Sequence, residues 1–283
     1  MNFHQHPITY VSDVTLKIED LNRAVAFYTE VVGLKVHHQT DKTAALTADG
    51  SSVLVTLEQP DHVVPKEKNR TGLYHFALLV PKRSDLTEVV QHFVNKEVSF
   101  LAEDHLVSEA LYIWDPDGNG IEIYADRDPS QWDWKNGEVA MTSDPIKTTD
   151  LLPKGEPKPW KGLPAGTIMG HIHLHVARIE AAERFYTKGL GFELVNRHNE
   201  QTIFVSDGKY HHHVALNTWQ GIGAHASSPE SVGLQSFSVV FPDEETRDKR
   251  LVQLEDVGAS VKEENGEYVT EDPSGNQIIL RHE

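Results

Sequence analysis

The sequence contains no cysteine among its 283 residues. This absence excludes disulfides, cysteine-ligated iron–sulfur clusters and thiol nucleophiles, so a bound metal must be held by histidine and carboxylate side chains. No apolar run approaches the roughly 18 residues of a membrane span, and residues 1–10 lack the apolar core of a signal peptide. A cytoplasmic protein with no membrane partner is therefore expected.

Positive charge is also scarce, because 26 Lys and Arg residues stand against 43 Asp and Glu residues, which gives a formal net charge of −17. Such a surface repels nucleic acid and anionic membranes, and neither is expected as a partner. Histidine, by contrast, is abundant, with 17 residues. With 39% hydrophobic residues, a chain of this length can bury a substantial core and is expected to form two domains.

The chain contains an internal repeat. Residues 14–18 alternate like a strand, and residues 21–32 have the apolar spacing of a helix. Residues 171–176 and 180–190 repeat this pattern, and both helical segments contain the sequence Phe-Tyr-Thr. Repetition at this scale indicates that the fold is assembled from copies of one supersecondary unit.

Two further copies begin at residues 72–77 and 233–238, and each is followed by a helical segment. Both end in a turn sequence, Asp-Pro-Asp-Gly-Asn in one and Asp-Pro-Ser-Gly-Asn in the other. Each copy is therefore a strand, a helix and about three strands; units one to four begin near residues 8, 72, 168 and 232. The predicted organisation is an N-terminal domain over 1–126, a Pro-, Trp- and Lys-rich connection over 127–166, and a C-terminal domain over 167–283.

The four units, their Phe-Tyr-Thr helices and the segment Asp-Pro-Asp-Gly-Asn-Gly-Ile-Glu-Ile-Tyr at 115–124 resemble the vicinal oxygen chelate superfamily of glyoxalases, bleomycin resistance proteins and extradiol dioxygenases. The resemblance covers essentially the whole chain and is strongest to bacterial catechol 2,3-dioxygenase-like proteins. It implies an α+β fold in which four βαβββ units pair into two curved mixed-sheet barrels. It also implies metal ligands on the first and last strands of paired units.

The two ligand positions can be compared across the four units. At the first-strand position, units one to four carry Asp13, His75, His171 and Ser236. At the last-strand position they carry Leu54, Glu122, His212 and Ile279. Because metal-type side chains are concentrated in units two and three, we expect one site built from these units, with units one and four kept for structure. Pairing within one chain and pairing across a dimer both stay open, as does a homo-oligomeric state.

The expected metal ligands are His75, Glu122 and His171. Two imidazoles and one carboxylate leave three coordination positions open, which suits non-haem Fe(II), or Mn(II) as the alternative. A catechol would take two positions and O₂, the co-substrate, the third. In the family all three ligands come from units three and four, whereas here they come from units two and three.

The resemblance also implies catalytic roles for His105, Tyr112 and His212. Tyr112 would hydrogen-bond a substrate oxygen, and His105 would stabilise the bound catecholate or accept its proton. His212 begins a His-x-Val-Ala segment that in the family places a histidine beside the O₂ site. This assignment requires Tyr112 and Glu122 to be cross-strand partners, which a five-residue turn allows and a two-residue turn does not.

Each of these residues has a structural alternative. Glu122 could lie on a solvated face of its hairpin, and His75 could be an ordinary core histidine. Alternation leaves open which residue of unit three is the ligand, among His171, His173 and His175. The register is equally open among His211, His212 and His213.

The expected activity is that of an extradiol dioxygenase that opens a catechol-type ring next to the diol, in the breakdown of aromatic compounds. One alternative is a glyoxalase-like lyase or isomerase on Zn²⁺ or Ni²⁺, which needs a fourth protein ligand. Another is a metal-free resistance protein that binds an aromatic compound. The pocket walls are expected from the loop at 219–233 and from Trp132, Trp134 and Trp160 in the connection.

Overall fold

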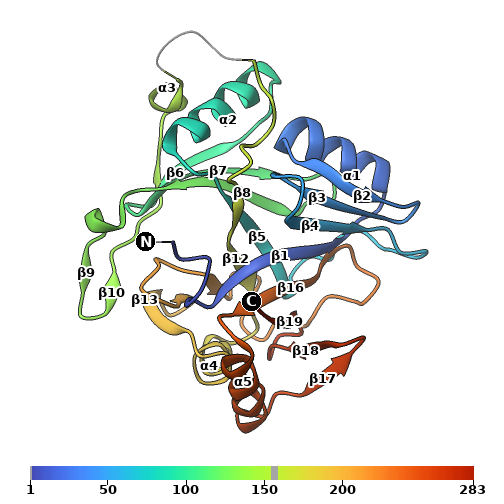
Figure 1. Cartoon of the computed structure of the whole chain (residues 1–283), viewed down its shortest axis with the longest axis vertical. Helices are drawn as coiled ribbons and strands as arrows, with labels where there is room; N and C mark the ends of the chain where they lie inside the picture. The colour runs from blue at the N-terminus through green and yellow to red at the C-terminus, as the bar shows by residue number, and fades with distance from the viewer. Residues whose placement is uncertain (1, 154–158) are drawn as a thin grey trace.

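The computed structural model describes residues 2–153 and 159–283 as four βαβββ units and a connection (Figure 1). Unit one contains β1 (Tyr10–Lys17), α1 (Leu21–Phe27), the π-helical turn η1 (Tyr28–Val32), β2 (Lys35–Gln39), β3 (Thr43–Thr47) and β4 (Val53–Glu58). Unit two contains β5 (Gly72–Leu79), α2 (Arg83–Asn95), β6 (Leu101–Asp104), β7 (Ser108–Trp114) and β8 (Gly120–Asp126).

The connection follows unit two and contains short elements, η2 (Pro129–Gln131), β9 (Trp134–Lys135), β10 (Glu138–Val139), β11 (Asp144–Pro145) and α3 (Thr148–Leu151). Unit three contains β12 (Ile168–His175), α4 (Ile179–Arg184), the π-helical turn η3 (Phe185–Gly189), β13 (Glu193–Asn199), β14 (Thr202–Ser206) and β15 (Val214–Asn217). Unit four contains β16 (Gly233–Phe241), α5 (Glu244–Asp256), β17 (Val261–Glu264), β18 (Glu267–Glu271) and β19 (Gln277–His282).

The units pair into two mixed sheets within one chain. One sheet has nine strands in the order β11-β6-β7-β8-β5-β12-β15-β14-β13, and the other has eight in the order β17-β18-β19-β16-β1-β4-β3-β2. The antiparallel pair β5–β12 joins unit two to unit three, and β1–β16 joins unit one to unit four. Inside each unit the first strand runs parallel to the last. The predicted α+β fold of paired βαβββ units is confirmed.

The repeated sequence motifs tie one unit to the next. The side chain of Asp20 accepts a hydrogen bond from the backbone of Arg23 and caps α1, and the helical segment ends at Gly33 with φ +93°. The tyrosine of the first Phe-Tyr-Thr motif, Tyr28, is fully buried and donates to Oδ2 of Asp115 at 3.0 Å. That carboxylate also accepts from the backbone of the Asp-Pro-Asp-Gly-Asn turn.

Unit three repeats this contact toward unit four, where Tyr186 donates to Oδ2 of Asp272 at 3.1 Å. Figure 1 shows α1 and α2 at one end of the molecule and α4 and α5 at the other, with the strands between them. The main core draws fully buried side chains from all four first strands: Leu16, Phe76, Leu174 and Phe237. Among the described helices, none has the length and apolar character needed to span a membrane.

Candidate metal centre and surrounding pocket

A β-bulge occurs at the same place in the first strand of every unit. The residues skipped by the pairing register are Ser12, Tyr74, Gly170 and Gln235, and they immediately precede Asp13, His75, His171 and Ser236. Bulges redirect the neighbouring side chains and occur frequently beside functional sites. The four first-strand positions aligned by sequence are therefore structurally equivalent, and His171 is the residue of unit three that corresponds to His75.

Three buried side chains from units two and three converge across the β5–β12 pair. Nε2 of His75 and Nε2 of His171 each lie 3.0 Å from Oε2 of Glu122. Glu122 pairs with Ala77 on the parallel strand β5, so it lies two residues beyond His75 on the same face. Within the described part of the chain, this is the only group of three or more His, Asp or Glu residues with candidate ligand atoms within 4.8 Å of one another.

The protonation states of this cluster suit a divalent metal. Burial by itself would raise the pKa of Glu122, but the facing His171 and His75 imidazoles hold that pKa well below its usual range. Burial lowers the pKa of His171 to about 4, despite the opposing effect of Glu122. The contact of His75 Nε2 with Glu122 does not have hydrogen-bond geometry, so within the described residues this buried nitrogen has no hydrogen-bond partner, and a metal would satisfy it. The two imidazoles and the carboxylate could thus hold a divalent metal such as Fe(II) or Mn(II).

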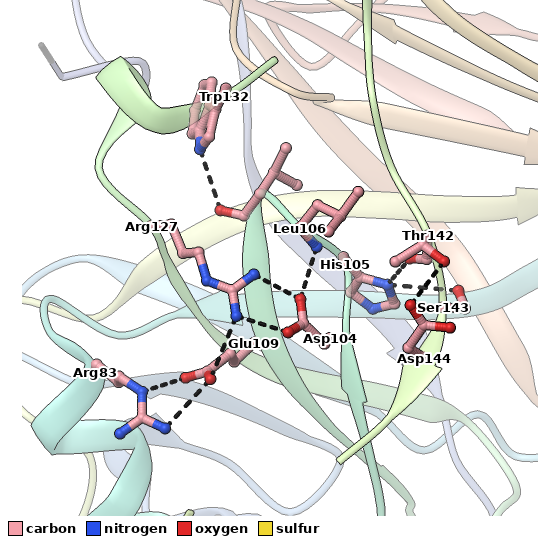
Figure 2. A network of polar contacts seen from close by, with 11 residues as sticks. Arg83, Asp104, His105, Leu106, Glu109, Arg127, Trp132, Thr142, Ser143 and Asp144 are labelled. Carbon is pink, nitrogen blue, oxygen red and sulfur yellow. Dashed lines mark hydrogen bonds and ion pairs between the residues drawn. The ribbon is translucent and has the colours of Figure 1, made fainter.

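Tyr112 lies directly above this cluster, because it is the cross-strand partner of Glu122 across the five-residue turn. Its hydroxyl is 2.7 Å from Nε2 of His105. On the other side of this ring, Nδ1 of His105 is 2.7 Å from the carbonyl oxygen of Thr142 (Figure 2). A carbonyl only accepts, so in the neutral ring Nδ1 carries the proton and Nε2 accepts from Tyr112. Burial, Glu122 and Glu103 raise the pKa of Tyr112 well above its usual value, which keeps its phenol protonated.

The predicted strand position of His212 is wrong. By register, the counterpart of Glu122 in unit three is Ala215, which pairs with His173 two residues beyond His171. His212 instead lies in the loop before β15, three residues ahead of the expected register position. The same comparison places Thr56, and not Leu54, at the last-strand position of unit one.

His212 nevertheless lies beside the cluster. Its ring centroid is 4.0 Å from that of His171, and it contributes to the wall of the pocket. Nδ1 of His212 is 2.8 Å from Nδ1 of His211, whose Nε2 is 2.8 Å from Oδ1 of Asp126. Burial lowers the pKa of His212 well below its usual value, so its imidazole is neutral.

The other two histidines of β12 have partners outside the cluster. The side-chain amide of Asn217, which is fully buried, lies between them. Its Oδ1 accepts from Nδ1 of His175 at 2.7 Å, and its Nδ2 donates to Nε2 of His173 at 2.9 Å. The structure therefore brings His171, and neither of these two, to Glu122.

Above the cluster is a cavity of about 150 Å³. Its floor includes His75, Glu122 and Tyr112, and its apolar walls include Phe204 and Trp219. This volume and apolar character suit a single aromatic ring.

The tryptophans of the connection do not line this pocket, contrary to expectation. Trp132 is buried in a separate small cluster against which Trp134 packs, and Trp160 stacks on His92. The connection contributes instead through residues 141–143, because β11 pairs with β6 and brings this segment to His105. Pairing between segments so far apart in the chain leaves no local sequence signal.

Comparison with known proteins agrees with this architecture. Residues 11–123 and 168–280 match the model of the Glyoxalase/Bleomycin resistance protein/Dioxygenase superfamily. The chain belongs to this superfamily. It is 40% identical over 277 residues to a catechol-2,3-dioxygenase of Bacillus subtilis (strain 168), with 97% of each chain covered.

Two solved structures share the superfamily fold at low sequence identity. A putative dioxygenase from Bacillus subtilis matches with a TM-score of 0.62 and 13% identity, over 96% of this chain and 84% of the other. Glyoxalase I from Zea mays matches with a TM-score of 0.58 and 16% identity, over 96% of this chain and 92% of the other. At these identities, the likeness concerns the fold alone.

In this superfamily member, the pairing of units one and four carries different chemistry. Asp13, which corresponds to His75, has Oδ2 3.0 Å from Nη1 of Arg281 and accepts at Oδ1 from Ser238 at 3.0 Å. Arg281 thus neutralises Asp13, the acidic residue at the first-strand position of unit one. The counterpart of Glu122 in unit four is Ile279, which has no donor atom. These contacts support the expectation that units one and four serve the structure.

Proposed function

We propose that the protein is an extradiol dioxygenase that inserts O₂ into a catechol-type ring next to the diol, with Fe(II), or Mn(II), held by His75, Glu122 and His171. The observation that carries this proposal is the buried two-imidazole, one-carboxylate cluster beneath a cavity sized for one ring. The 40% identity to a catechol-2,3-dioxygenase over nearly the whole chain supports the same chemistry.

Three protein ligands leave room for substrates on the cavity side. When bound, the metal would template the two catechol oxygens and O₂ and would lower the pKa of a coordinated phenol. Glu122 and the two imidazoles already face one another, so these side chains need to move little to hold such an ion.

Tyr112 and His105 are placed to take a proton from the substrate. The hydroxyl hydrogen of Tyr112 is directed to Nε2 of His105, so the Tyr112 oxygen keeps lone pairs that can accept from a catechol hydroxyl. A proton passed to Tyr112 can continue to His105, which is mostly buried with its side chain 15% exposed. Thr142 fixes the orientation of His105 from the other side. The pair therefore serves as general base for the diol.

His212 lies on the opposite side of the cluster, against the ring of His171. Its neutral imidazole is oriented by His211, which Asp126 orients in turn. We assign His212 to the O₂ side of the site, where a positioned imidazole can hold or deliver a proton.

A glyoxalase-like lyase is less well supported by the geometry. That chemistry needs a fourth protein ligand, and the structural counterpart of Glu122 in unit three is Ala215, which has no donor atom. A metal-free aromatic-binding protein would leave Nε2 of His75 buried without a hydrogen-bond partner in the described structure.

Oxygen uptake tests the proposal. Protein purified anaerobically and loaded with Fe(II) should consume O₂ and catechol in equal amounts and form the yellow ring-opened product. His75→Ala and Glu122→Gln should abolish both signals, whereas His62→Ala, at an exposed histidine, should not. Tightly bound zinc or nickel without oxygen uptake would favour the lyase, and failure to retain any metal would favour the binding protein.

A further inference from the structure

Apart from its five histidines, the charged residue types that line the cavity are all acidic. The described residues lining it include no lysine or arginine, and its two carboxylates are Glu122 and Glu103. Glu103 is on β6, where it pairs with Ala110, and Ala110 shares a face of β7 with Tyr112. Tyr112 in turn pairs with Glu122, so Glu103 projects toward the same side of the sheet as the metal cluster.

The neighbouring carboxylates, by contrast, are neutralised on the other face of the sheet. Asp104 and Glu109 are cross-strand partners and bind arginines: Arg127 contacts both carboxylates, and Arg83 contacts Glu109 (Figure 2). Arg127 lowers the pKa of Asp104 below its usual value. Both arginines therefore bind carboxylates on the face of the sheet opposite Glu103.

Glu103 itself has no lysine or arginine partner among the described residues. Its one ion-pair contact among the described residues is a long one to His105, whose Nε2 lies 3.9 Å from Oε2 of Glu103 and only 2.7 Å from the hydroxyl of Tyr112. The Glu103 side chain is 32% exposed, so its carboxylate is accessible to a ligand. An unpaired carboxylate at the mouth of an apolar cavity attracts cations and repels anions.

Aromatic side chains surround the same opening. Trp114 and Trp219 are 49% and 48% exposed, which is unusual for so large an apolar side chain. Tyr74 is half-buried, and its ring lies 5.2 Å from that of Trp219 at 85°. Aromatic faces next to a carboxylate bind ammonium groups through cation–π and charge interactions. The net charge of −17 adds a long-range field of the same sign.

We propose that Glu103 and the aromatic rim of Tyr74, Trp114 and Trp219 make the site selective for catechols whose ring substituent is a protonated amine, and that they disfavour carboxylate substituents. The inference rests on the proposed function, in which the diol binds at the metal cluster and the substituent extends to the rim. A partly exposed charge pair changes affinity by up to about fivefold. Attraction of the amine and repulsion of the carboxylate together therefore predict a difference of up to about 25-fold between the two ligands.

Anaerobic calorimetry measures this preference without turnover. Fe(II)-loaded protein is titrated, in the absence of O₂, with catechols that carry an aminoethyl, an ethyl or a carboxymethyl group para to one hydroxyl. The Kd is expected to rise in that order. Glu103→Gln should reduce the ratio between the carboxymethyl and aminoethyl Kd values by up to about 25-fold, because both the attraction and the repulsion are lost. Glu264→Gln, the same charge change at an exposed residue of β17, should leave the ratio unchanged.

A salt titration of the unmodified protein provides a second readout. Raising the ionic strength from about 0.01 M to about 1 M shortens the screening length from about 30 Å to about 3 Å and should shrink the ratio. Equal affinities for the three ligands, or a ratio that survives in Glu103→Gln, would overturn the inference while leaving the dioxygenase intact. Failure of all three catechols to bind would overturn both.

Discussion

Replacing Gly120 with alanine tests how closely β8 must approach β5 to build the metal cluster. Gly120 pairs with His75, and a Cβ at this position would lie 2.3 Å from the carbonyl oxygen of Tyr74 and 3.0 Å from Cβ of His75. Ordinary C···O contacts are at about 3.3 Å, so the strands must separate by about 1 Å. The backbone of Gly120 is not left-handed, so the cost is steric.

Overpacking of this kind should lower the free energy of unfolding by about 1–3 kcal/mol. Because a misplacement of about 1 Å in a reacting group costs about 10²-fold, kcat/KM for catechol should fall by about that factor. Denaturant unfolding, metal titration and oxygen uptake measure the three effects. In the control Gly189→Ala, the added Cβ meets side chains and no backbone atom: Cδ2 of Leu254 at 2.8 Å and Cγ2 of Val257 at 3.3 Å. Wild-type metal affinity and kcat/KM in Gly120→Ala would refute the reasoning.

Fe(II) or Mn(II) at about 100 times its Kd should stabilise the fold by about 2.7 kcal/mol, a rise in Tm of about 5–11 °C. The shift should vanish in Glu122→Gln and persist in Asp13→Asn; equal shifts in both variants would place the metal elsewhere. Tyr112→Phe should keep the metal but lower kcat about 10²-fold or more, and an unchanged kcat would remove Tyr112 from proton transfer. Tyr28→Phe and Tyr186→Phe should each lower the free energy of unfolding by about 1.5–3 kcal/mol, because each leaves a buried carboxylate one donor short; a loss below about 0.5 kcal/mol would contradict this.

The repeat and the first-strand alignment could be predicted from sequence because each depends on short, local patterns. Apolar spacing predicts a helix over residues 21–32, and the structure has a helical segment there that begins after the capping Asp20 and ends at Gly33. The alignment of His75 with His171 is correct because each is the fourth residue of its strand and directly follows the bulge. The cross-strand pairing of Tyr112 with Glu122 also followed from the length of one turn.

The last-strand positions could not be predicted as well. These positions depend on the lengths of the intervening loops and hairpins, so Leu54 and His212 differ from the register of the paired strands by two and three residues. Similarly, the π-helical turn that buries Tyr28 against Asp115 depends on contact between two units, which helical periodicity does not report. The division of the chain at 127–166 stays a prediction.

The pocket walls depended most on contacts between distant segments. The approach of Thr142 to His105 requires β11 to pair with β6 across the domain. The isolation of Glu103 requires that the nearby arginines be committed to Asp104 and Glu109, which the sequence of β6 and β7 does not show.

Anomalous X-ray scattering at the iron edge, from crystals grown anaerobically with Fe(II), tests the central claim most directly. We expect one strong peak per chain, about 2.0–2.3 Å from Nε2 of His75, Nε2 of His171 and a carboxylate oxygen of Glu122. All three ligands should come from the same chain, because β5 and β12 pair within it. A peak at another group of side chains, or no peak at this cluster in iron-saturated crystals, would contradict the account.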